Sequence, residues 1–158
     1  LVESQPRGCL YIATAEAGDA EMLARIRAHR ACRGARWRTI EAPLDIAGAL
    51  TRSEPADGAI LVDCLTLWLA NLMAAGRQPA AEAERLVAAL RAAALPVVLV
   101  ANEVGLGIVP DNALARAFRD HAGRLNQTMA ALADAVVLMV AGLPLAVKPA
   151  AAAAGVTS

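Results

Sequence analysis

A histidine and three arginines in one short stretch form the first group of residues that could do chemistry. His29 is followed closely by Arg30, Arg33 and Arg36. An unprotonated imidazole nitrogen can attack phosphorus, and guanidinium groups bind phosphate oxygens in a two-pronged fork. The stretch therefore indicates transfer of a phosphorus-containing group. It is also compatible with a solvated basic helix end, because positive charge suits the C-terminal dipole of a helix.

Polar residues that close apolar runs form the second group. Thr14, Glu41 and Asp63 each end such a run, and residues 102–103, Asn-Glu, end another. The carboxyl ends of parallel strands meet at one edge of a sheet, where α/β proteins bind their ligands. Asp63 has the form of the acidic residue that holds magnesium in phosphate-loop enzymes. Glu103 has either a functional or a loop-ordering role on the same predicted edge.

The 158 residues do not contain the phosphate-loop pattern Gly-x-x-x-x-Gly-Lys-Ser/Thr. Either the chain is not a phosphate-loop protein or the loop belongs to a segment upstream of Leu1. The pattern Gly-x-Gly-x-x-Gly does not follow any expected strand, which disfavours a dinucleotide-dependent oxidoreductase. The two histidines, His29 and His121, offer no spacing for a metal-ligand set.

The elements that must position these residues alternate between short apolar runs and amphipathic stretches. Strands without a polar face, alternating with helices, predict one α/β domain over residues 1–148, with a mostly parallel sheet covered by helices on both sides. An alanine-rich tail follows at residues 149–158. The expected strands are 9–14, 37–41, 59–63, 96–103, 135–140 and 145–148, and the expected helices are 20–31 after Asp19, 44–50, 65–73, 80–93 and 111–134.

The composition narrows the class of protein further. Fifteen basic residues balance fifteen acidic ones, which gives no argument for nucleic acid or an anionic membrane as partner. Three cysteines without CxxC spacing indicate free thiols in a reducing compartment, so the predicted location is the cytoplasm. The apolar region 129–147 is interrupted by Asp134, Gly142 and Pro144, and a membrane span is not predicted.

Several segments together carry a resemblance to a known family. The most specific is residues 102–110, Asn-Glu-Val-Gly-Leu-Gly-Ile-Val-Pro, which continues through 116–120 to 123–127. With the other segments, the chain resembles the bifunctional adenosylcobinamide kinase/adenosylcobinamide-phosphate guanylyltransferase family of cobalamin biosynthesis. Those other segments are 10–14, 25–26 with His29 and Arg33, 37–39 with Glu41, and 61–66.

The resemblance implies a fold and two reactions. The fold is a RecA-like, three-layer P-loop NTPase whose first strand and phosphate loop are absent from this chain. The first reaction phosphorylates adenosylcobinamide with ATP or GTP, and the second transfers GMP from GTP to the product, giving adenosylcobinamide-GDP. The resemblance further implies Mg²⁺ and a homotrimer with active sites near the subunit interfaces. The alternative is a non-catalytic nucleotide-sensing or scaffold protein of similar fold.

The resemblance also implies roles for individual residues. His29 matches the histidine that carries GMP covalently between the two half-reactions, and Asp63 would orient Mg²⁺ directly or through water. The Glu41 carboxylate can accept hydrogen bonds from the N1–H and 2-amino groups of guanine. The implied nucleotide-binding residues are Ala13, Thr14, Ala15, Arg30, Ala31, Cys32, Arg33, Glu41 and Asp63.

Overall fold

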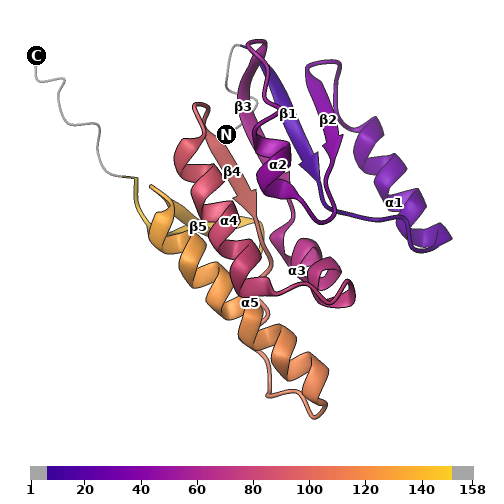
Figure 1. Cartoon of the computed structure of the whole chain (residues 1–158), viewed down its shortest axis with the longest axis vertical. Helices are drawn as coiled ribbons and strands as arrows, with labels where there is room; N and C mark the ends of the chain where they lie inside the picture. The colour runs from indigo at the N-terminus through magenta and orange to yellow at the C-terminus, as the bar shows by residue number, and fades with distance from the viewer. Residues whose placement is uncertain (1–6, 151–158) are drawn as a thin grey trace, which may run out of the picture.

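The computed structural model of the chain describes residues 7–150. Figure 1 shows strands and helices alternating along most of this length, as the sequence predicts. In chain order the elements are β1 (Gly8–Ala13), α1 (Ala20–Ala31), β2 (Trp37–Glu41), α2 (Ile46–Leu50), β3 (Asp57–Asp63), α3 (Leu65–Ala74), α4 (Pro79–Ala92), β4 (Val97–Val100), α5 (Ala113–Leu132), β5 (Val136–Val140) and β6 (Leu143–Lys148).

The main sheet has the strand order β2-β1-β3-β4, and each neighbouring pair is parallel. Ala13 is paired with Glu41 on one side and with Asp63 on the other, and Asp63 is paired with Val100. The carboxyl ends of the four strands therefore lie at one edge. The predicted α/β class and mostly parallel sheet are confirmed, as is the convergence of polar strand ends.

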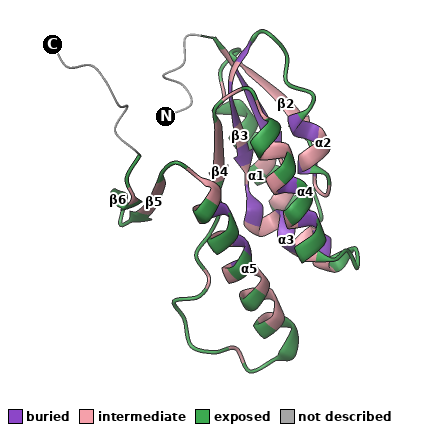
Figure 2. Ribbon diagram, turned by 60° about the vertical axis from the view of Figure 1, so that its left-hand side comes forward, coloured by how far each residue is buried: buried purple, intermediate pink, exposed green. Residues whose placement is uncertain are grey.

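The main hydrophobic core lies between this sheet and helices α2 to α5. Alternate residues of a strand point to opposite faces, so Leu10 and Ile12 of β1 lie on the same face as Ile60 and Val62 of β3. Figure 2 shows the buried residues concentrated on the central strands and on the sides of the helices. The helix residues that fill this core are Ile46, Leu65, Trp68, Leu69, Leu72, Leu86, Leu125 and Met129.

The opposite face of the sheet has a much smaller apolar cluster. Cys9 and Ala59 are buried there and pack against Trp37, Leu61 and Val98. Helices were expected on both faces, yet α1 buries none of its residues. In residues 7–150, the large helical layer thus covers one face only. The second face carries the polar strand ends Glu41 and Asp63.

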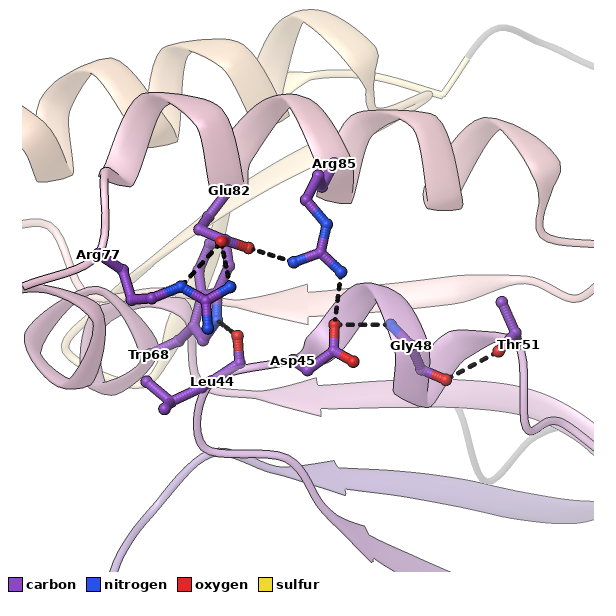
Figure 3. A network of polar contacts seen from close by, with 8 residues as sticks. All are labelled: Leu44, Asp45, Gly48, Thr51, Trp68, Arg77, Glu82 and Arg85. Carbon is purple, nitrogen blue, oxygen red and sulfur yellow. Dashed lines mark hydrogen bonds and ion pairs between the residues drawn. The ribbon is translucent and has the colours of Figure 1, made fainter. Parts of the chain in front are cut away.

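A polar network joins α2 to α4 at the rim of the core (Figure 3). Asp45 caps α2 by accepting a hydrogen bond from the amide of Gly48 at 3.1 Å, and it also accepts one from Arg85 at 3.1 Å. Arg85 donates to Glu82 at 2.7 Å, and Arg77 donates to the same nearly buried carboxylate. Two arginines therefore neutralise the one acidic side chain of α4 that packs inward.

One predicted strand end and one expected strand pairing differ from the structure, for identifiable reasons. β4 ends at Val100 and not at 103, because the amide of Asn102 donates to Thr66 Oγ1 at 2.7 Å, outside the strand ladder. The last two strands form an antiparallel hairpin of their own, apart from the main sheet. Ala141 and Gly142 both have positive φ, as a tight two-residue hairpin turn requires.

In the described part of the chain, no helix has both the length and the apolar character needed to cross a membrane.

Replacement of Leu72 by alanine is expected to destabilise the fold strongly. Leu72 is fully buried in the main core, and Leu→Ala changes at such sites lower the free energy of unfolding by about 3 kcal/mol. The matched control is Leu114→Ala, since the Leu114 side chain is 72 % exposed. Urea denaturation measures both variants, and equal stabilities would contradict this assignment of the core.

Candidate active site

The predicted site residues of the sheet lie on the face opposite the main core. Ala13, Glu41 and Asp63 are in register, so their side chains point to the same side. Tyr11 stands two residues before Ala13 in β1 and therefore shares that face. The second face of the sheet thus carries the carboxylates of two strand ends and one phenol.

The Asp63 carboxylate is held by Tyr11. The Tyr11 hydroxyl donates to Asp63 Oδ2 at 2.5 Å. Burial of the ring, together with this hydrogen bond, raises the pKa of Tyr11 to about 12, so the phenol keeps its proton near neutral pH. Asp63 Oδ1 has no hydrogen-bond partner among residues 7–150. One carboxylate oxygen is therefore fixed and the other is available.

Thr14 joins the ends of β1 and β3. Its side chain is fully buried, and its Oγ1 accepts from the amide of Cys64 and donates to the carbonyl of Cys64, each at 2.8 Å. The Thr14 amide donates to the Asp63 carbonyl at 3.0 Å, and Asn71 donates to the Thr14 carbonyl at 2.8 Å. Thr14 was predicted to contact nucleotide, and in the structure its hydroxyl is hydrogen-bonded to the backbone of Asp63 and Cys64. The neighbouring Ala13 and Ala15 are partly exposed.

Two arginines bring the end of α1 to this face. The Arg33 guanidinium carbon lies 3.5 Å from the centroid of the Tyr11 ring, a cation–π contact. Arg30 forms an ion pair with Glu41 at the end of β2. Arg36, the third arginine of the cluster, instead donates to the backbone carbonyl of Arg7 at 2.7 Å. The structure therefore places two of the three arginines at the candidate site.

His29 lies in the last turn of α1, immediately before Arg30. Residues 29–32 are exposed, with Ala31 ending the helix and Cys32 as its C-cap. In the described part of the chain, the imidazole makes no hydrogen bond or ion pair, so neither kind of contact joins His29 to Asp63 or Thr14. Both ring nitrogens are therefore open to a ligand.

Glu103 orders the loop that follows β4. Its carboxylate accepts from the amide of Gly105 at 2.6 Å, two residues further along the chain. This contact supports the loop-ordering role of the two roles considered for Glu103.

His121, for which the sequence indicated no role, lies away from this face. It lines a cavity of about 710 Å³ between α3, α4 and α5. The residues predicted to bind nucleotide do not line that cavity.

The residue that sequence reasoning missed is Tyr11. Its position in β1, two residues before Ala13, is enough to place it on the face of the strand ends. The hydrogen bond to Asp63 spans 52 positions of sequence, and no local pattern indicates it. The Trp37 ring packs edge-to-face against the Tyr11 ring on this face, with 6.0 Å between the two ring centroids.

Asp63 fits a magnesium ion that is held mainly by a nucleotide. Residues 7–150 contain no group of three acidic, histidine or cysteine side chains able to cage a metal. Nucleotide-bound Mg²⁺ needs only one or two protein carboxylates, because phosphates and waters supply the remaining ligands. The unpartnered Oδ1 of Asp63 meets that need.

A parallel sheet that brings a strand-end carboxylate and two arginines together at the carboxyl ends of its strands defines an α/β protein suited to binding a phosphate-containing ligand. The family model described as cobinamide kinase / cobinamide phosphate guanyltransferase matches residues 1–147. The chain therefore belongs to that family, whose two activities are a kinase and a guanylyltransferase reaction.

Curated relatives agree with the family assignment. The chain is 46 % identical over 140 residues to the bifunctional adenosylcobalamin biosynthesis protein CobP of Pseudomonas aeruginosa, covering 87 % of this chain and 81 % of that protein. It is 43 % identical over 154 residues to the protein CobU of Salmonella typhimurium and 39 % identical over 154 residues to that of Escherichia coli. Both of those matches cover 88 % of this chain and 85 % of the relative.

Replacement of Thr14 by valine is expected to lower the free energy of unfolding by about 1–3 kcal/mol, because the backbone groups of Cys64 lose their buried partner. Valine keeps the shape of threonine without its hydroxyl. The matched control is Thr14→Ser, which retains the hydroxyl and should be clearly more stable. Urea denaturation compares the two variants, and a valine variant as stable as the serine one would contradict the role given to the hydroxyl.

Proposed function

We propose that this protein phosphorylates adenosylcobinamide with ATP or GTP and then transfers GMP from GTP to adenosylcobinamide phosphate. The products of the second reaction are adenosylcobinamide-GDP and pyrophosphate. Family membership supports both activities. The observation that carries the proposed route is the unpartnered imidazole of His29, next to two arginines that reach the face carrying Asp63.

His29 is the proposed nucleophile of the guanylyl transfer. Its unprotonated ring nitrogen attacks the α-phosphorus of GTP, a nitrogen–phosphorus bond forms, and the bond to the bridging oxygen breaks as pyrophosphate leaves. An oxygen of adenosylcobinamide phosphate then attacks the same phosphorus and displaces the imidazole. This route requires a histidine with no competing partner, which agrees with the exposed position of His29.

Arginines and backbone groups supply the proposed nucleotide contacts. Arg30 and Arg33 are placed to bind phosphate oxygens and to stabilise the charge that develops on them. The hydroxyl, amide and carbonyl of Thr14 are all engaged within the fold, so the proposed contacts at residues 13–15 would come from the backbone of Ala15 and the methyl groups of Ala13 and Ala15. Contacts at residues 31–32, Ala-Cys, would lie at the exposed end of α1.

Glu41 is the proposed reader of guanine. Its carboxylate can accept from the N1–H and the 2-amino group, a pair of donors that adenine does not present. In the structure this carboxylate is paired with Arg30. On binding, the guanine N1–H and 2-amino group would replace the Arg30 guanidinium as the hydrogen-bond donors to Glu41. Arg30 would then be released toward the phosphates.

Asp63 is the proposed carboxylate for Mg²⁺ carried by the nucleotide. When bound there, Mg²⁺ neutralises charge on the phosphates that react. The protein's own part is to hold the carboxylate in place, with one oxygen engaged by Tyr11 and the other available.

We further propose that the protein assembles as a homotrimer in the cytoplasm. Exposed apolar side chains on the loop before α5 and on the β5–β6 hairpin support self-association, among them Leu106, Ile108 and Leu145. Within residues 7–150, no disulfide bond joins Cys9, Cys32 and Cys64, which is compatible with a reducing compartment.

The proposed function is tested by labelling the enzyme, expressed from its complete reading frame, with GTP labelled at the α-phosphate. We expect acid-labile, alkali-stable label on the peptide that contains His29, as a phosphoramidate requires. His29→Ala should abolish this label and the guanylyl transfer while leaving part of the kinase activity. The control is His121→Ala, which should label normally. A protein that binds GTP and stays unlabelled would favour a plain kinase or a nucleotide sensor.

Substitution of Asp63 by asparagine is expected to slow both reactions by roughly tenfold or more, because the carboxylate toward Mg²⁺ loses its charge. Steady-state rates for each reaction, measured over a range of Mg²⁺ concentrations, give the size of the effect. Asp134→Asn is the matched control, since Asp134 is exposed on a distant loop. A full kinase rate in Asp63→Asn would remove Asp63 from this role.

A further inference from the structure

Tyr11 contacts both functional groups that meet on the second face of the sheet. Its hydroxyl donates to Asp63 Oδ2 at 2.5 Å, and its ring lies 3.5 Å from the Arg33 guanidinium carbon. It is the single tyrosine of the chain, and only 7 % of its surface is exposed. Its position between a strand-end carboxylate and an arginine from the end of α1 distinguishes it from the apolar residues around it.

The hydroxyl of Tyr11 limits the freedom of Asp63. An aspartate side chain can rotate about two bonds, and a short hydrogen bond to one oxygen fixes the orientation of the whole carboxylate. The backbone of Asp63 is held independently, through the Thr14 amide at 3.0 Å. Thus Thr14 fixes where Asp63 stands in the fold, and Tyr11 fixes how its carboxylate is turned.

The ring of Tyr11 limits the freedom of Arg33. Helix α1 buries none of its residues fully, so burial of apolar surface contributes little to holding its end against the sheet. The contacts that reach from this end to the second face are the Arg33–Tyr11 stack and the exposed Arg30–Glu41 ion pair. A stacked guanidinium keeps its plane on the ring and its N–H groups directed outward.

We propose that Tyr11 is a positioning residue shared by the two reactions, its hydroxyl orienting Asp63 and its ring seating Arg33. This inference rests on the proposed function, since it takes Asp63 and Arg33 as groups that serve phosphoryl and guanylyl transfer. Tyr11 itself does not touch the reacting atoms in this scheme. It acts through one carboxylate and one guanidinium.

The two contacts of Tyr11 can be removed separately. Tyr11→Phe loses the hydroxyl and keeps an aromatic face for Arg33, whereas Tyr11→Leu loses both. Each variant is made in the enzyme expressed from its complete reading frame. GTP binding is measured by calorimetry with Mg²⁺ and with EDTA, and both reaction rates are measured against Mg²⁺ concentration. The calorimetry is done in a His29→Ala background, in which the covalent step cannot occur, so it reports on nucleotide binding without turnover.

For Tyr11→Phe, we expect the Mg²⁺ concentration that gives half-maximal rate to rise roughly tenfold, because a hydrogen bond to a charged group is lost. GTP affinity in EDTA should stay unchanged, and so should the labelling rate of His29 at saturating Mg²⁺. For Tyr11→Leu, the labelling rate should also fall, by roughly threefold or more, because the cation–π contact is lost.

A double-mutant comparison separates positioning from general structural support. In an Asp63→Asn background, Tyr11→Phe should change the Mg²⁺ dependence less than twofold, because the group it acts through is already altered; a purely structural effect would add in full. If Tyr11→Leu fails to fold, Tyr11→Met provides the second arm, because it removes the aromatic face and keeps a long side chain. It should slow labelling as Tyr11→Leu does, and the excess over Tyr11→Phe measures the loss of the Arg33 contact.

Three results would overturn the inference. They are a Tyr11→Phe enzyme with the wild-type Mg²⁺ dependence, an effect that adds in full to that of Asp63→Asn, and unchanged labelling when the Arg33 contact is removed. Failure of the proposed function is recognised before any substitution, because the wild-type enzyme would then lack kinase activity, labelling of His29, or both. That result would overturn the role of Tyr11 together with the function.

Discussion

The pairing of β1 with strands on both of its sides is the constraint on which the candidate site depends. Through that pairing, Ala13 stands level with Glu41 and with Asp63. Thr14 then extends the connection past the end of the ladder by hydrogen bonding to the backbone of Asp63 and Cys64. A shift of one residue in either register would turn one carboxylate to the opposite face of the sheet.

One face of the sheet forms the main hydrophobic core, and the other carries the candidate site. One face is packed by α2 to α5 and contains the large apolar side chains, including the fully buried Trp68. The other has a small apolar cluster and carries Tyr11, Glu41 and Asp63 near its edge. Because the stabilising core lies on the first face, polar groups on the second can be arranged for binding without unpaired charges in the main core.

Much of the fold could be predicted because local signals agree with it. Trp37–Glu41 alternates and stops before a proline, and the structure has a strand at those residues. Asp19 stands directly before one predicted helix and Asn112 lies at the predicted start of another, and each accepts a hydrogen bond from the first turn of its helix as the N-cap. The polar strand ends were likewise visible, since each one interrupts an apolar run.

The remaining features depend on contacts that no local pattern encodes. The Tyr11–Asp63 hydrogen bond and the Arg33–Tyr11 stack join residues far apart in the sequence. Periodicity indicates that β5 and β6 are strands and does not specify which partner each one takes, so their separate hairpin was missed. β4 ends earlier than predicted because the Asn102 amide donates to the hydroxyl of Thr66 in α3.

The Arg30–Glu41 ion pair has a thermodynamic consequence of its own. Its side chains are 50 % and 65 % exposed, and ion pairs in such positions contribute about 0–1 kcal/mol to folding. Opening the pair therefore removes little of the free energy that keeps the chain folded. The strand-end carboxylate is kept in a defined orientation by a contact weak enough for a better hydrogen-bond donor to replace it.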